Sequence, residues 1–344
     1  MVRYTFLILT CVLLSGIARA QDPQFSQYYS APLYLNPGFT GITPQQRIVV
    51  NHRIQWPNLP QAFATYAASY DIFVEELRSG FGVIATRDKM GSAGWTTTTV
   101  NGLYSFKVKL SENLVFSPGI SFGYGINGLD RTLLRLEDGL RYRDGQSVDP
   151  ELNKLGNQSY FDFGSGFIFY NRNLWLGAAF HHMNQPNLSV LGDISRLPMK
   201  TSIHGGARIP LYRGPRTIAK ISYLTPSFIY RQQGPAFKQL DVGINYHIDP
   251  VSVGFWYRGK PFEKTVINTI AQDAMIMQLG LYFKNLTVGY SYDFTVSELQ
   301  TSAGGAHEIS MIFEFSAKPV NRSVKRKYRL IPCPSFNSKE GFWN

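Results

Sequence analysis

Apolar and polar residues alternate with a period of two along several stretches of this chain, and this pattern limits the fold more than any other feature. Between 286 and 296, in LTVGYSYDFTV, every even-numbered residue is apolar or aromatic and every odd-numbered residue is small or polar. The stretches 114–127, 239–248 and 307–315 follow the same pattern. Because strand side chains alternate between two faces, each stretch predicts a strand with one apolar and one polar face.

Segments of this kind cover most of the chain and predict an all-β fold of about fourteen strands. They lie near 47–56, 61–73, 79–87, 95–107, 113–127, 158–170, 173–182, 200–211, 218–230, 236–248, 251–258, 274–283, 286–295 and 306–316. Short turns are expected near 74–78, 108–112, 171–172, 212–217, 249–250 and 284–285, and they alternate with loops that include 128–157, 183–199, 259–273 and 296–305.

An even strand number, with short turns at one rim and longer loops at the other, is typical of an antiparallel transmembrane β-barrel of the outer membrane. Both termini then lie in the periplasm. The alternative is a large soluble β-sandwich or jelly roll, which would also alternate but would not be expected to show so regular a rhythm of turns and loops.

The first 20 residues predict a secretory signal peptide. They combine a basic start at Arg3, an apolar run over 6–14 and the ending Ala18-Arg19-Ala20, with cleavage expected before Gln21. We therefore expect four parts: a signal peptide (1–20), a periplasmic N-terminal segment (21–46), an outer-membrane β-barrel (47–316) and a basic periplasmic tail (317–344).

The net charge and the residues on the two faces of each strand indicate what the barrel contacts outside and inside. The formal net charge of +11, about +9 without the signal peptide, favours an acidic partner or an anionic surface. Outer-membrane lipid and lipopolysaccharide are expected partners, and nucleic acid is not. Apolar faces should contact lipid, with aromatic girdles drawn from Trp56, Trp95, Tyr170, Trp256, Tyr257 and Phe283. Polar faces should line the lumen with Arg53, Asp71, Arg208, Asp241, His247, Asp293 and Glu308.

Just behind the expected cleavage site lies an uncharged, aromatic stretch that does not suit a solvent-exposed tail. SQYYSAPLYLNPGFTG, residues 26–41, contains four aromatic residues and two prolines. Asn36-Pro37-Gly38 predicts a turn, because proline fixes its own φ and glycine tolerates a positive one. Two interpretations stay open: the segment buries itself in the barrel and seals it, or it docks a periplasmic component.

This start resembles the PorP/SprF family, outer-membrane proteins of the type IX secretion system in Bacteroidetes. The family pattern D-P-x-[FY]-S-Q-[FY] falls on residues 22–28, and N-P-[AG] followed by glycine falls on 36–38 and Gly41. The ending RLIPCPSF after a basic stretch is similar to that of members with an extension beyond the barrel. The resemblance implies a role in exporting secreted proteins with a C-terminal type IX targeting domain and attaching them to the cell surface. In gliding bacteria these partners include motility adhesins, and periplasmic secretion or motility components are further partners.

The candidate partner-binding residues lie at the two ends of the mature chain. Between 317 and 331 the tail has six basic residues and no acidic one, which predicts contact with an acidic partner. The candidates are Phe25, Gln27, Tyr28, Tyr29, Tyr34, Asn36, Pro37, Lys325, Arg326, Lys327, Arg329 and Cys333.

No catalytic motif stands out. The six histidines show no H-x-x-x-H spacing, so a zinc site has no support and we expect no metal or cofactor. Three functions remain: a secretion and surface-attachment component, a channel for a small hydrophobic or polar solute, and an outer-membrane enzyme with catalytic residues scattered at the rim. We favour the first, and we expect no enzymatic activity.

Overall fold

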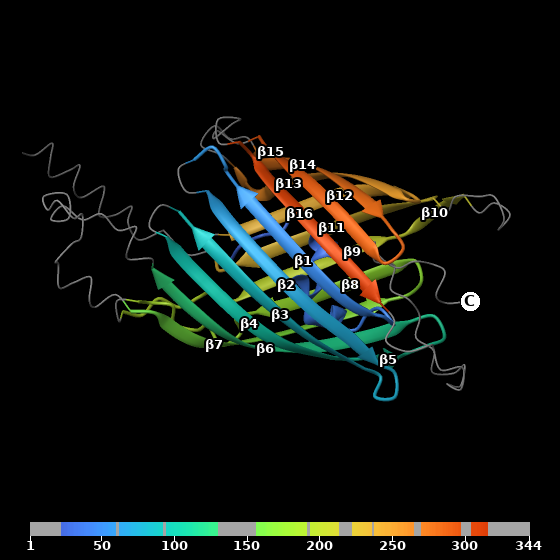
Figure 1. Ribbon diagram of the computed structural model, residues 1–344, viewed down its shortest axis with the longest axis horizontal. Helices are drawn as coiled ribbons and strands as arrows, with labels where there is room; N and C mark the ends of the chain where they lie inside the picture. The colour runs from blue at the N-terminus through green and yellow to red at the C-terminus, as the bar shows by residue number, and fades with distance from the viewer. Residues whose placement is uncertain are drawn as a thin grey trace, which may run out of the picture.

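The chain folds into a closed barrel with its N-terminal segment inside (Figure 1). The computed structural model describes residues 22–59, 62–91, 94–129, 156–190, 193–212, 222–235, 237–264, 270–296 and 304–315. Within these ranges, no helix is long and apolar enough to cross a membrane.

Sixteen strands make up the sheet in the described residues. They are β1 (Gln46–Gln55), β2 (Phe63–Val74), β3 (Ser79–Met90), β4 (Trp95–Phe106), β5 (Val108–Lys109), β6 (Val115–Leu129), β7 (Gln158–Tyr170), β8 (Leu174–His181), β9 (Lys200–Ala207), β10 (Ile209–Tyr212), β11 (Ser222–Gln233), β12 (Phe237–Ile248), β13 (Val251–Lys264), β14 (Ile270–Tyr282), β15 (Leu286–Thr295) and β16 (Ala306–Phe315). All neighbouring strands are antiparallel.

Two pairings close the ring. β1 pairs with β16 from Gln46 opposite Phe315 to Gln55 opposite Ala306, and β9 pairs with β11. The short strand β5 pairs with β6 just after β4, and β10 pairs with β11 just after β9, so each continues the strand before it. The wall therefore has fourteen strand positions, and the predicted antiparallel barrel is confirmed.

The two rims differ as the sequence predicts. Short turns and both ends of the barrel segment lie at one rim, which we call the turn rim, and the longer connections lie at the other, the loop rim (Figure 1). The expected loop at 259–273 is wrong in extent, because β13 continues to Lys264 and β14 begins at Ile270. Pro261 and its charged neighbours resemble a loop in sequence, but the hairpin continues pairing past them.

The outer face of the barrel is apolar all the way round. Each of the fourteen wall strands presents at least one exposed large apolar side chain: Val50, Tyr66, Val83, Val100, Ile120, Phe161, Leu176, Ile203, Phe228, Ile244, Phe255, Leu279, Phe294 and Met311. A soluble protein rarely exposes a continuous apolar surface of this size. An outward apolar band over a closed sheet is the structure of an outer-membrane barrel, and the chain is one.

Three of the six residues predicted for the aromatic girdles face inward instead. Tyr170 and Trp256 are 2% and 4% exposed, and Trp95 lines a cavity of the lumen. The period-two pattern of each strand decides the face, and position near a strand end does not override it. Phe283 is exposed, as a girdle residue should be.

Candidate functional site

The lumen is occupied by the residues that precede β1, which we call the plug (residues 22–45). They form three short turns, η2 (Tyr28–Ser30), α2 (Pro32–Leu35) and η3 (Pro37–Phe39), seen in blue inside the barrel in Figure 1. Pro32 and Pro37 each open a turn, a position where the missing N–H costs no hydrogen bond. The Asn36 side chain accepts a hydrogen bond from the Gly38 N–H at 2.8 Å and so starts η3.

Aromatic plug side chains pack edge-on against aromatic wall residues. The rings of Tyr28 and Trp256 lie 5.4 Å apart, and those of Tyr29 and Trp175 lie 5.5 Å apart. Such T-shaped pairs are favourable beyond the area they bury. Arg258 donates to the Tyr28 hydroxyl at 3.1 Å, so the polar end of this buried ring also has a partner.

A second aromatic pair lies within the plug itself. Phe25 and Tyr34 make an edge contact at 5.1 Å. The Tyr34 hydroxyl donates to the Pro23 carbonyl at 2.6 Å, and the ammonium of Lys200 lies 5.0 Å from the centre of its ring. Burial raises the pKa of Tyr34 well above its ordinary value. The hydroxyl therefore stays a donor, and the plug keeps its fold by its own contacts as well as by those with the wall.

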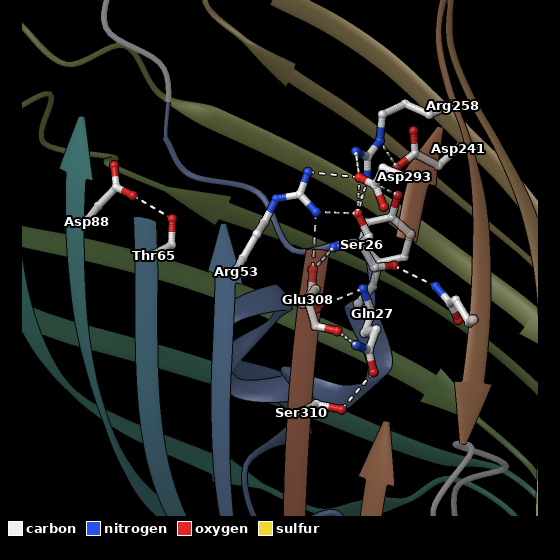
Figure 2. Close-up of polar contacts among 12 residues, drawn as sticks. Ser26, Gln27, Arg53, Thr65, Asp88, Asp241, Arg258, Asp293, Glu308 and Ser310 are labelled. Atoms are coloured by element: carbon white, nitrogen blue, oxygen red, sulfur yellow. Dashed lines mark hydrogen bonds and ion pairs between the residues drawn. The ribbon is translucent and has the colours of Figure 1, made fainter. Parts of the chain in front are cut away.

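Ser26 stands at the centre of a buried ion-pair network (Figure 2). Its hydroxyl donates to Asp293 at 2.6 Å and its N–H donates to Glu308 at 2.6 Å. Arg53 and Arg258 both donate to the Ser26 hydroxyl oxygen, at 2.8 and 2.9 Å, and both pair with Asp293.

The same network extends along the wall and is balanced in charge. Arg231 pairs with Asp241, and Arg258 lies 3.4 Å from the same carboxylate. Together with the residues around Ser26, three arginines meet three carboxylates. Buried charges are tolerated only when paired and hydrogen-bonded, so the plug and the strands depend on one another here.

Gln27 docks the plug on β15 and β16. Its amide donates to the Glu308 carbonyl at 3.1 Å and accepts from the Ser310 hydroxyl at 2.7 Å. A Cβ at Gly289 would lie 2.3 Å from the Gln27 side-chain oxygen. Glycine at this inward position of β15 therefore makes room for the plug.

Asn36 binds the opposite wall. Its side-chain NH₂ donates to the carbonyls of Phe167 and Ala178 at 3.1 and 3.0 Å, and it lies 3.0 Å from His204 Nε2. Asn36 is fully buried, so its amide must find its hydrogen-bond partners within the protein. A Cβ at Gly166 would lie 2.3 Å from the Asn36 oxygen, so this wall glycine too marks a plug contact.

The end of the plug rests on glycines and is held by a lysine. A Cβ at Gly119 would lie 2.4 Å from the carbonyl carbon of Pro37, and one at Gly80 would lie 2.2 Å from the Thr40 oxygen. Lys107 donates to that Thr40 oxygen at 2.8 Å. Only a backbone without a side chain can approach the plug this closely.

The start of the plug is anchored near the loop rim. Asp22 exchanges hydrogen bonds with Gln233 and lies 2.8 Å from His182 and 3.1 Å from Lys200; His182 also pairs with Asp162 at 2.9 Å. Burial alone would raise the pKa of Asp22, but the charges of His182 and Lys200 hold it well below its usual range. Burial would lower the pKa of His182, but the charge of Asp22 raises it to about 9. Both groups are therefore charged at neutral pH.

The sequence-predicted lumen residues lie where expected. Arg53, Asp71, Arg208, Asp241, Asp293 and Glu308 are buried and face inward, and half-buried His247 lies on the same face of β12 as Asp241. In β1 and β2, Arg47 and Asp71 form a pair with two contacts of 2.9 Å, and Asp71 also accepts from the Gly41 N–H at 2.8 Å. Sequence reasoning missed Arg47 and the basic residues Lys107, Lys200, Arg231 and Arg258. Each of them lies at a position that period-two alternation assigns to the inward face, and this was the available signal.

The candidate partner-binding residues fall into two groups. Phe25, Gln27, Tyr28, Tyr29, Tyr34, Asn36 and Pro37 all lie in the lumen and contact the wall or one another. Partner binding by these residues stays a prediction. Lys325, Arg326, Lys327, Arg329 and Cys333 lie outside the described residues, as does most of the predicted loop 128–157. Within the described part of the chain, no three His, Cys, Asp or Glu side chains come together as a metal site.

Comparison with known proteins gives one family and several distant barrels. Residues 17–313 match the family described as type IX secretion system membrane protein PorP/SprF. No curated protein matches the sequence significantly. The fold is similar to the P. putida toluene transporter TodX (9% identity, 82% of this chain and 93% of that chain, TM-score 0.45). It is also similar to the Acinetobacter baumannii outer membrane protein Omp33 (9%, 80% and 100%, TM-score 0.42) and to a Pseudomonas aeruginosa FadL homologue (12%, 81% and 91%, TM-score 0.42). These distant likenesses carry no argument about function.

Proposed function

Because the chain belongs to the PorP/SprF family of type IX secretion system membrane proteins, we propose that it supports the export and surface attachment of proteins with a C-terminal type IX targeting domain. Gliding adhesins are among the partners that this proposal includes. The barrel acts as a closed outer-membrane platform with its C-terminal tail in the periplasm, and it holds its partners at the rims without passing solutes or catalysing a reaction.

The plug is the observation that carries this proposal. Its contacts reach strands on opposite sides of the lumen, from Glu308 on β16 to the Phe167 carbonyl on β7. Its buried charges are matched by charges on the wall. The lumen of a porin is a water-filled channel, whereas here a segment of the same chain fills it.

The experiment combines a pull-down with a conductance measurement. The tagged barrel is purified from native membranes in mild detergent and its partners are identified by mass spectrometry; the same preparation is then placed in planar lipid bilayers. We expect exported proteins with a C-terminal targeting domain in the purified complex and no steady conductance. A steady open pore with no exported protein would favour the solute-channel alternative and contradict the proposal.

The C-terminal tail is the proposed periplasmic contact with the secretion machinery. Its basic residues suit an acidic partner. Deleting residues 319–344 should leave a barrel that assembles in the outer membrane, because the last wall strand ends at Phe315, while exported partners are no longer retained. A truncated protein that retains its partners normally, or one that fails to assemble, would contradict this assignment.

The loop 128–157 is the proposed contact at the cell surface. It is rich in charged residues of both signs, and β6 and β7 join it at the loop rim. An epitope tag inserted near Gly145 should be labelled on intact cells. The matched control is a tag in the turn at Asn113, which should be labelled only after lysis. The reverse pattern would show that the barrel is inserted the other way round.

A further inference from the structure

A cavity of about 860 Å³ lies between the plug and the loop rim. Strands β3, β4, β6 and β7 form its wall, together with the end of β8 at His181 and the start of β9 at Lys200. Plug residues 22–23 and 33–34 line its base, and residues 188–190 and 193–198 line it from the β8–β9 connection. Its volume is in the range of sites that bind small molecules or a few side chains of a partner. The platform role proposed above does not use it.

One buried carboxylate facing this cavity has no positive partner. Asp88 is 4% exposed, and it accepts one hydrogen bond, from the Thr65 hydroxyl at 2.5 Å. Its other oxygen, Oδ2, is buried and has no partner. Figure 2 shows Asp88 well apart from the network around Ser26, with only one of its oxygens joined to a neighbour.

Six other acids that line the lumen differ from Asp88. Asp71, Asp241, Asp293 and Glu308 each pair with an arginine, Asp22 pairs with a histidine and a lysine, and Asp162 pairs with that histidine. No basic side chain in the described ranges lies within ion-pair distance of Asp88. A buried carboxylate without a counter-charge is costly, so this position suits a cation that comes from elsewhere.

The strand register places an aromatic ring and hydroxyls in line with Asp88. Asp88 on β3 lies opposite Thr97 on β4. Two residues nearer the loop rim, Met90 lies opposite Trp95, and two residues deeper, Thr86 lies opposite Thr99. All six side chains line the cavity. Successive inward positions on a strand are about 6.8 Å apart, so an alkyl chain that passes Trp95 would bring its charged end to Asp88.

We propose that this cavity binds a primary ammonium group, with Asp88 as its counter-ion and Trp95 as the surface for the attached alkyl chain. An ammonium has several hydrogen-bond donors to share between the free carboxylate oxygen and neighbouring hydroxyls. An aromatic ring suits both the cation and its methylene stem. The chemistry is that of a lysine side chain of a polypeptide or of a free aliphatic diamine. The proposal stands independently of the secretion role.

Calorimetry on the full-length barrel in detergent tests the proposal with matched probes. A blocked pentapeptide with one central lysine is compared with the same peptide carrying Nε-acetyl-lysine, and cadaverine serves as the free amine. We expect the charged probes to bind, the acetylated peptide to bind at least about 10-fold more weakly, and Asp88→Asn to weaken binding by about 10- to 100-fold. Tighter binding of the peptide than of cadaverine identifies a polypeptide source, and the reverse identifies a small amine.

A stability measurement separates a binding carboxylate from a structural one. In the absence of amine, Asp88→Asn should leave the apparent unfolding temperature unchanged or raise it, because it removes a buried charge that has no counter-ion. Asp71→Asn is the matched control and should lower that temperature, since buried Arg47 loses its ion pair with Asp71.

Three results would overturn the proposal. The first is the absence of binding by either charged probe. The second is equal binding of the lysine and acetyl-lysine peptides. The third is a fall in the unfolding temperature of Asp88→Asn as large as that of Asp71→Asn, which would make Asp88 a structural residue.

Discussion

Replacing Gly119 by alanine tests how tightly the plug is seated. Gly119 faces inward on β6, and an added Cβ would lie 2.4, 2.5 and 2.6 Å from the Pro37 carbon, the Pro37 oxygen and the Gly38 nitrogen. Ordinary van der Waals contact begins near 3.4 Å, so the space is short by roughly 1 Å. All three atoms belong to the backbone, so no rotation of a side chain can relieve the clash, and either the plug or β6 must move.

The magnitude follows from the cost of overpacking. Forcing an extra carbon into a packed interior costs about 1–3 kcal/mol. Gly102→Ala on the neighbouring strand β4 is the matched control, because its Cβ would point outward with only the Phe122 oxygen nearby, at 3.9 Å. Alanine in a strand is about 0.5–1 kcal/mol better than glycine when nothing clashes. Both variants share this gain, so they should differ in free energy of unfolding by the cost of the clash, roughly 1–3 kcal/mol.

The assay is urea unfolding of the barrel in lipid vesicles, followed by tryptophan fluorescence. Limited proteolysis adds a readout of the plug itself, which should be cut faster in Gly119→Ala than in Gly102→Ala. Equal stability and equal cleavage of the two variants would refute the reasoning, since they would show that the plug does not press against β6.

Three further predictions concern ion pairs, lipid contact and pH. Asp71→Asn should lower the free energy of unfolding by about 3–5 kcal/mol in urea, because buried Arg47 loses the carboxylate 2.9 Å away; a loss under about 1 kcal/mol would contradict this. Ile120→Arg should cost about 2–4 kcal/mol near the bilayer midplane and impair heat-modifiable assembly, whereas Ile120→Leu should not. The pKa of His182 is raised from 6.5 to about 9 beside Asp22, so its stabilisation is complete below about pH 6.5 and is lost as pH rises through 9. His182→Gln should flatten the alkaline fall in unfolding temperature, and an unchanged fall would exclude this histidine as its source.

The wall of the barrel could be predicted because the residue pattern of each strand by itself shows which of its faces is apolar. Period-two alternation fixes which residues of β6 or β15 face lipid without any knowledge of the rest of the chain. It also assigns Tyr170 to the lumen, since Phe169 beside it is exposed. The girdle prediction was wrong at Tyr170 because its position near a strand end does not decide its face, whereas the period-two alternation of β7 does.

The interior could not be predicted in the same way, because its contacts join distant parts of the chain. Ser26 and Glu308, whose hydrogen bond holds the plug to β16, are 282 residues apart. Alternation marks Glu308 as inward but does not name its partner. The wall glycines were a usable signal, since mid-strand glycines such as Gly119 are costly unless another backbone approaches. Which backbone approaches them required the structure.

Cysteine accessibility at Ala31 tests the central claim, that the N-terminal segment lies inside the barrel. Ala31 is 4% exposed in the plug, and Cys333→Ser gives a mature chain without other cysteines. In that background, Ala31→Cys should react with a water-soluble maleimide on the order of 100-fold more slowly than Asn113→Cys in an exposed turn, because reaction requires local opening. Both should react fully after denaturation. Equal rates in the folded barrel would show that the plug is not buried, and they would contradict the proposal of a closed platform.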